Sequence, residues 1–94
     1  MSKYESMMVF SVVKGEEVTH GLVESFTKLI GENGEVLSVD EWGKRTLAYE
    51  INDEKDGYYV VFTYESKEDF PAEISRKAGI TEGVLRIMTT SKNV

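Results

Sequence analysis

Hydrophobic residues along the chain recur first at every second position, then at every third or fourth, and then again at every second, and this cycle occurs twice. No other feature of the sequence constrains the fold as strongly. A period of two is typical of a strand, and a period near 3.6 is typical of a helix. The strand spacing covers residues 4–13, 36–51, 58–65 and 84–90, and the helix spacing starts at Glu16 and again at about Glu68. The sequence therefore predicts the order strand, helix, strand, strand, helix, strand.

The two predicted helices each have one apolar stripe and signals at their ends. The first begins with Glu16 and Glu17, whose charge suits a helix N-terminus, and Gly31 or Gly34 is expected to cap its end. Its stripe consists of Val18, Leu22, Val23, Phe26, Leu29 and Ile30. The second is expected to follow a capping box from Ser66 to Asp69 and to end at Gly79, with the stripe Phe70, Ile74 and Ala78.

This order of elements predicts the topology. Each strand-helix-strand unit needs a right-handed crossover. Interleaving two such units gives a four-stranded antiparallel sheet with both helices on one face, the α+β ferredoxin-like split β-α-β fold. The polar run from Asn52 to Gly57 is expected to form the turn between the middle strands, with Asp56-Gly57 as its hairpin signal. We expect one domain over residues 1–94, with residues 91–94 as a frayed terminus, and one sheet face without helices.

Composition narrows the classes of function. A chain of 94 residues with 40% apolar and 30% charged residues is typical of a small globular domain. No apolar run is long enough to span a membrane and no signal peptide is evident, so a cytoplasmic location is expected. The net charge of −6 disfavours phosphate binding over the whole surface, so any contact with RNA should be local.

Catalysis is poorly supported by the sequence. There is no Cys, and the single histidine, His20, has no second histidine with which to ligate a metal. Gly31 to Gly34 is followed by a strand and not by a helix whose N-terminus would face a phosphate. We therefore expect no enzymatic activity, no cofactor, no metal and no small-molecule substrate.

The segment from Asp40 to Asp53 concentrates unusual features. It contains the only Trp, Trp42, followed by Gly43, Lys44 and Arg45. A glycine inside a strand pattern suggests a bulge, which would reorient Lys44 and Arg45 relative to Trp42. After the glycine, one side of the strand is expected to carry Arg45, Leu47, Tyr49 and Ile51. The last three residues make that side apolar.

The same segment resembles the signature of a known family. The runs Trp42-Gly43-Lys44-Arg45, Leu47-Ala48-Tyr49 and Ile51-Asn52 are similar to those of bacterial small-subunit ribosomal protein six. The resemblance covers most of the chain, because further matches occur in the right order: Tyr4-Glu5, Gly34, Gly57-Tyr58-Tyr59, and Val84-Leu85-Arg86 with Met88.

The resemblance implies a structural component of the small ribosomal subunit. It would bind the central domain of 16S ribosomal RNA together with small-subunit ribosomal protein eighteen, and would be a monomer off the ribosome. Lys3, Lys44, Arg45 and Arg86 are expected to contact RNA, and Trp42, Leu47, Tyr49 and Asn52 to dock the partner protein. Ser2 and Glu50 depart from the family pattern, where a basic residue and a proline are common.

Other interpretations stay open at this point. Gly57 to Phe62 is similar to the third-strand motif of an RNA recognition motif, but Tyr58 and Tyr59 should point to opposite faces. A dimeric sheet protein with an apolar pocket would use Met7, Met8 and Met88. Arg86 could form a salt bridge, and Trp42 and Tyr49 could pack in the core.

Overall fold

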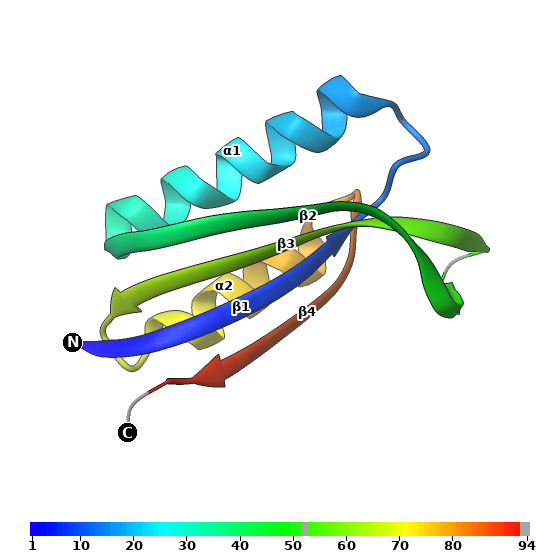
Figure 1. The fold of residues 1–94 in the computed structure, drawn as a ribbon. Coiled ribbons are helices and arrows are strands. Elements are labelled where there is room, and N and C mark those ends of the chain that lie inside the picture. The colour runs from blue at the N-terminus through cyan, green and yellow to red at the C-terminus, as the bar shows by residue number, and fades with distance from the viewer. Residues whose placement is uncertain (52, 93–94) are drawn as a thin grey trace.

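A computed structural model describes residues 1–51 and 53–92 of the chain (Figure 1). The elements are β1 (Ser2–Phe10), α1 (Glu16–Asn33), β2 (Gly34–Ile51), β3 (Glu54–Ser66), α2 (Phe70–Ile80) and β4 (Val84–Ser91). The strands form one antiparallel sheet in the order β2-β3-β1-β4. The predicted ferredoxin-like α+β fold is confirmed, and β1 occupies the expected central position.

Both helices cover one face of the sheet, and the core lies between them and the strands. The side chains that α1 contributes include Val23, Phe26 and Ile30, which are buried. The predicted stripe of α2 is confirmed, since Phe70, Ile74 and Ala78 are buried as well. They meet alternate residues of the two central strands: Tyr4, Met8 and Phe10 from β1, and Val60, Phe62 and Tyr64 from β3.

A cluster of hydroxyl groups is buried at one end of this core. The Ser6 hydroxyl is 2.9 Å from the Tyr64 hydroxyl and 2.8 Å from the Thr89 hydroxyl, so it joins the three side chains. Burial raises the pKa of Tyr64, while the hydrogen bonds to Ser6 and Thr89 oppose that rise. The cluster satisfies polar groups that would otherwise be unpaired inside the protein.

The hairpin between β2 and β3 turns earlier in the chain, and more tightly, than the sequence predicts. The two strands pair as far as Ile51 with Glu54, so Asp56-Gly57 lies within β3 and its expected place in the turn is wrong. Asp53 has the positive φ of 64° that a tight turn requires. Because β1 pairs with β3 only as far as Tyr58, the last part of this hairpin extends beyond the rest of the sheet, as Figure 1 shows.

Gly57 is therefore a strand residue with a packing role. A Cβ atom at this position would lie 2.4 Å from the Val9 Cγ1 atom and 3.2 Å from the Leu47 Cδ2 atom. The missing side chain lets Leu47 fold down beside Val9, across the sheet. A signal that resembled a turn in the sequence is thus a site of close packing.

Helix ends also differ from the predictions. Ser66 pairs with both Ser2 and Gly34 as the last residue of β3, so it cannot cap α2. Asp69 holds the N-cap position without a side-chain hydrogen bond, and α2 passes Gly79 to end at Ile80. Gly34 opens β2 directly after α1, where a Cβ atom would lie 2.0 Å from the carbonyl oxygen of Glu65.

The last strand continues past its expected end. β4 runs to Ser91, and the Lys92 N–H donates a hydrogen bond to the carbonyl of Lys3 at 2.8 Å. The remainder of the expected frayed terminus, residues 93–94, lies outside the described residues, as does Asn52. Among the described residues, no helix combines the length and apolar character that a membrane crossing requires.

Candidate interaction surface on the free face of the sheet

The sheet face opposite α1 and α2, here called the free face, is defined by the strand register. Residues directly paired in an antiparallel sheet point to the same side. One row across the sheet consists of Gly43, Tyr59, Val9 and Arg86, and the next row of Asp40, Val61, Met7 and Met88. No helix covers these rows, because both helices pack on the other side.

A pair of parallel aromatic rings occupies the β2 side of the free face. The rings of Trp42 and Tyr59 lie 7° from parallel, with their centroids 6.4 Å apart. The Arg45 guanidinium lies 5.7 Å from the centroid of the Trp42 ring, at the range of a cation-π contact. The indole N–H donates a hydrogen bond to the Asp40 carboxylate at 2.9 Å, which orients the ring.

The bulge predicted at Gly43 is confirmed, and it explains this grouping. The register shifts between Glu41 and Gly43, and Gly43 has a φ of +86°. In a regular strand, residues three apart point to opposite faces. The extra residue in the bulge places Trp42 and Arg45 on the same face and sends Lys44 to the other.

Two of the four basic residues expected to contact RNA lie in one zone of the free face. Arg45 lies on β2 and Arg86 on β4, about 16 Å apart across three strand spacings and two residues along the strands. Both are exposed. Within residues 1–51 and 53–92, neither arginine forms an ion pair, so the salt bridge considered for Arg86 does not occur there.

The other two basic residues lie elsewhere. Lys44 points to the helix side, where its Nζ atom is 3.9 Å from an Asp56 carboxylate oxygen. Lys3 is on the free face, but it lies six residues along β1 from Val9, the partner of Arg86, a distance of about 20 Å. The structure therefore separates the expected patch of four into a pair and two outlying residues.

The residues expected to dock a partner protein also divide. Leu47 is buried beside Gly57, whereas Tyr49 on the protruding hairpin is 66% exposed and Trp42 is 46% exposed. The apolar side predicted for this part of β2 is thus not one buried face. Core packing does not account for Trp42 or Tyr49, and Asn52 lies outside the described residues.

Tyr59 is a surface residue that the sequence interpretation missed. Its neighbour Tyr58 points to the helix side and donates a hydrogen bond to Glu41 at 2.7 Å, which raises the pKa of Tyr58. The opposite orientations expected for these tyrosines are confirmed. The sequence did not show how β2 pairs with β3. That pairing, with the extra residue of the Gly43 bulge, places Trp42 on the same face as Tyr59.

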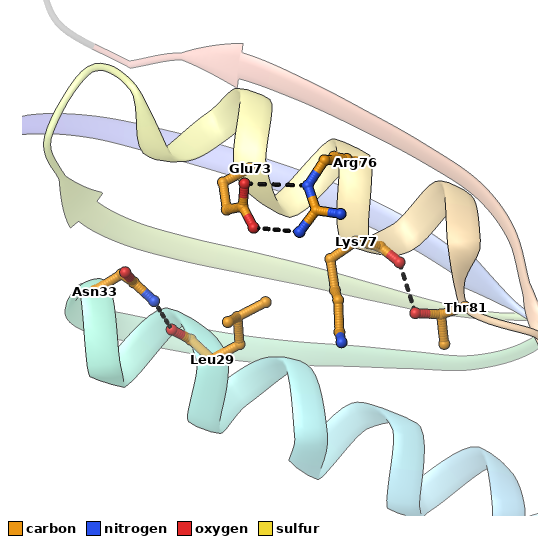
Figure 2. Close-up of polar contacts among 6 residues, drawn as sticks. All are labelled: Leu29, Asn33, Glu73, Arg76, Lys77 and Thr81. Carbon is orange, nitrogen blue, oxygen red and sulfur yellow. Dashed lines mark hydrogen bonds and ion pairs between the residues drawn. The ribbon is translucent and has the colours of Figure 1, made fainter.

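On the side of the molecule that carries the helices, in contrast to the free face, an arginine is ion-paired within its own helix. Figure 2 shows Arg76 bound by Glu73 one turn earlier, through hydrogen bonds of 2.6 and 3.2 Å. Lys77 points toward α1, over a groove of about 460 Å³ between the two helices. Among the described residues, no three His, Asp or Glu side chains gather as a metal site would require.

Comparisons with known proteins agree with the fold and with the sequence signature. The family model described as Ribosomal protein S6 matches residues 3–91. A protein of Caldanaerobacter subterraneus named small ribosomal subunit protein bS6 is 46% identical over 89 residues, which cover 94% of each chain. A protein of Clostridium novyi with the same name is 37% identical over 92 residues, 97% of each chain.

A solved structure shares the whole fold. The crystal structure of 30S ribosomal protein S6 from Thermotoga maritima superposes with a TM-score of 0.90. The match covers 97% of this chain and 87% of that one, at 29% sequence identity. The four-stranded sheet and its two helices therefore recur in a protein of the small ribosomal subunit.

Proposed function

Because the chain belongs to the ribosomal protein S6 family, we propose that it binds the central domain of 16S ribosomal RNA jointly with small-subunit ribosomal protein eighteen. Its family role is that of a structural, non-enzymatic component of the small ribosomal subunit, in the cytoplasm on the ribosome. The proposal concerns what the chain contacts there and through which residues.

The observation that supports the proposal is the uncovered sheet face, where Arg45 and Arg86 form no ion pair with any of residues 1–51 and 53–92. An arginine already held by a carboxylate must lose that partner before it contacts a phosphate, as Arg76 would have to do with Glu73. Arg45 and Arg86 have no such cost among the described residues. They are the side chains best placed to contact phosphate and sugar groups.

Because this chain has a net charge of −6, the partner protein would supply part of the positive charge that contacts the RNA. A uniformly acidic surface repels RNA, but a basic protein docked beside the two arginines would supply the missing positive potential. The joint surface would then be basic although this chain is acidic. In isolation the chain would be a monomer with weak affinity for RNA.

Tyr49 is the side chain that we assign most firmly to the partner protein. It is exposed on a hairpin that extends past the sheet, where it can enter a pocket of another protein. Exposed aromatic residues are typical anchors of protein interfaces. Asn52, which lies outside the described residues, belongs to the same proposed contact because it is part of the same sequence motif. Lys3 and Lys44 would contact RNA at the margins.

A gel-shift measurement over a salt series tests the joint surface. The purified chain is mixed with a central-domain fragment of 16S ribosomal RNA, alone and with the basic partner protein. We expect tight binding only when the partner is present, with affinity that falls as salt rises. Binding that is equally tight without the partner would contradict the joint surface.

The matched pair Arg86→Ala and Arg76→Ala adds the control. Both changes remove one positive charge, but only Arg86 lies on the free face. Weaker binding of Arg86→Ala with unchanged binding of Arg76→Ala is expected. Equal losses would mean that net charge, and not the free face, determines binding.

A further inference from the structure

Trp42 and Tyr59 are held in a geometry that has no evident use within the chain. Nearly half of the Trp42 surface is exposed, at 46%, although burying an indole is among the larger gains a side chain can provide. The indole is nevertheless fixed by its hydrogen bond to Asp40 and by its parallel contact with Tyr59. An exposed aromatic ring that is already held in one orientation can stack on another molecule at little further cost in conformational entropy.

The arrangement has the elements that recognise an unpaired base. Proteins hold single-stranded RNA by stacking bases on aromatic rings or on the plane of an arginine, beside positive charges that bind the backbone. Here two parallel rings lie across β2 and β3, and Arg45 lies over the Trp42 ring. Arg86 lies two strands away from Tyr59, about 10 Å at the usual spacing.

We propose that Trp42 and Tyr59 form a stacking platform for an unpaired nucleobase of the bound RNA, with Arg45 and Arg86 contacting the adjacent backbone. The proposal rests on the proposed function and specifies the chemistry of its free face. It assigns Tyr59 a binding role. It also implies that the RNA segment at this face is single-stranded, since bases inside a duplex are not available for stacking on protein side chains.

The position of Asp40 gives the platform a direction. Its carboxylate receives the indole N–H at one edge of the Trp42 ring, and a phosphate placed there would be repelled. Arg45 and Arg86 lie toward the Gly57 end of the sheet, away from the row of Asp40 and Val61. The backbone of the RNA would therefore follow the arginines, while the base lies over the rings.

Two RNA probes separate stacking from general attraction to phosphate. One is a labelled single-stranded 12-nucleotide RNA of mixed sequence, and the other is the same strand in a blunt duplex. Both are titrated into the intact chain at low salt, following label anisotropy and the emission of Trp42. We expect the single strand to quench Trp42 and to bind more tightly than the duplex.

Substitutions on the platform give the size of the effect. Loss of one base-aromatic stack weakens single-strand binding by about 5- to 150-fold, so Trp42→Leu and Tyr59→Leu should fall in that range. Trp42→Phe keeps an aromatic ring and should recover part of the affinity. Met88→Leu, on the same face but remote from the rings, is the matched control and should bind as the parent does.

The outcomes distinguish this proposal from the proposed function. Equal affinity for single strand and duplex, unchanged in Trp42→Leu, would overturn the platform while the joint complex with 16S ribosomal RNA could still form. If Trp42→Leu instead weakens only the binding of the partner protein, the platform docks protein and the base-stacking proposal is wrong. If the joint complex itself fails to form, the proposed function fails independently of the oligonucleotide result.

Discussion

The two faces of this sheet are made from the same strands, yet they differ in how their polar groups are satisfied. On the covered face the Ser6, Tyr64 and Thr89 hydroxyls satisfy one another inside the protein. On the free face the charged groups of Arg45 and Arg86 remain open to solvent. The covered face thus satisfies its hydroxyl groups within the chain, whereas the two guanidinium groups of the free face form no ion pair among the described residues.

β3 shows the contrast within consecutive residues. Val60, Phe62 and Tyr64 are fully buried under the helices, while Tyr59 is partly exposed on the free face, parallel to the Trp42 ring. The strand period of two is enough to place one set in the core and the other on a surface. Stability and recognition can therefore be changed separately by substituting neighbouring residues.

The largest expected effect is on folding, and it belongs to the covered face. Phe62→Ala should lower the free energy of unfolding by about 3 to 5 kcal/mol, because it removes a fully buried ring and leaves a cavity. Trp42→Ala should cost clearly less, because 46% of the Trp42 surface is already exposed to solvent in the folded chain. Urea unfolding followed by circular dichroism measures both, and comparable losses would remove the distinction between the faces.

The next effect is on binding and belongs to the protruding hairpin. Tyr49→Ala should weaken binding of the partner protein by at least about 2 kcal/mol, roughly 30-fold, if the ring fills a pocket. The melting temperature should hardly change, since Tyr49 is 66% exposed. Titration calorimetry with the partner protein gives the affinity, and an unchanged value would remove Tyr49 from the interface.

The hydroxyl cluster of the covered face should give a smaller loss of stability. Ser6→Ala removes the hydroxyl that joins Tyr64 and Thr89, at a cost of about 1 to 2 kcal/mol in the free energy of unfolding. In the Tyr64→Phe background the same change should cost less, because no phenol is left without its partner. An equal cost in both backgrounds would show that the hydroxyls are not coupled.

Unfolding at alkaline pH tests the Tyr64 phenol, which belongs to the same hydroxyl cluster. Burial raises the pKa of Tyr64, so the unfolded chain releases this proton near pH 10 while the folded chain retains it. The stabilisation is complete below pH 10 and is lost as pH rises through the folded-state pKa. Tyr64→Phe should reduce this fall, and Tyr58→Phe should reduce it further, because the pKa of Tyr58 is also raised.

The smallest effect is expected from one charge on the free face. Arg86→Ala should reduce the slope of log affinity against log salt by about one and leave the melting temperature nearly unchanged. Arg76→Ala should leave both quantities as they are in the parent. A large drop in melting temperature for Arg86→Ala would place Arg86 among the stabilising residues and remove the contrast between the faces.

The sequence was sufficient where a structural signal is local. The spacing of Phe70, Ile74 and Ala78 predicted the buried stripe of α2, and Gly43 predicted the bulge. Gly57 misled because its role is to admit Leu47 and Val9 from other strands, which no local pattern reveals. Ser66 misled for the same reason, since strand pairing on both sides overrides its capping preference.

The candidate surface was less predictable than the fold. The sequence motif indicated Trp42 and Arg45, but the register between β2 and β3 determines that Tyr59 lies beside them. Lys44 belongs to the same motif, yet the bulge turns it to the helix side beside Asp56. Motif spacing shows which residues are notable, and only the paired strands show which of them share a face.

The order of the strands in the sheet has a consequence for synthesis of the chain. β1 is the first of the strands to be made, but its two neighbours in the sheet are β3 and β4. β4 begins at Val84, and at a translation rate of about 5 to 20 residues per second it follows β1 by about 4 to 15 seconds. Until β4 has been made, a newly synthesised chain keeps its central strand unpaired on at least one edge, so the sheet becomes complete only with the last of its four strands.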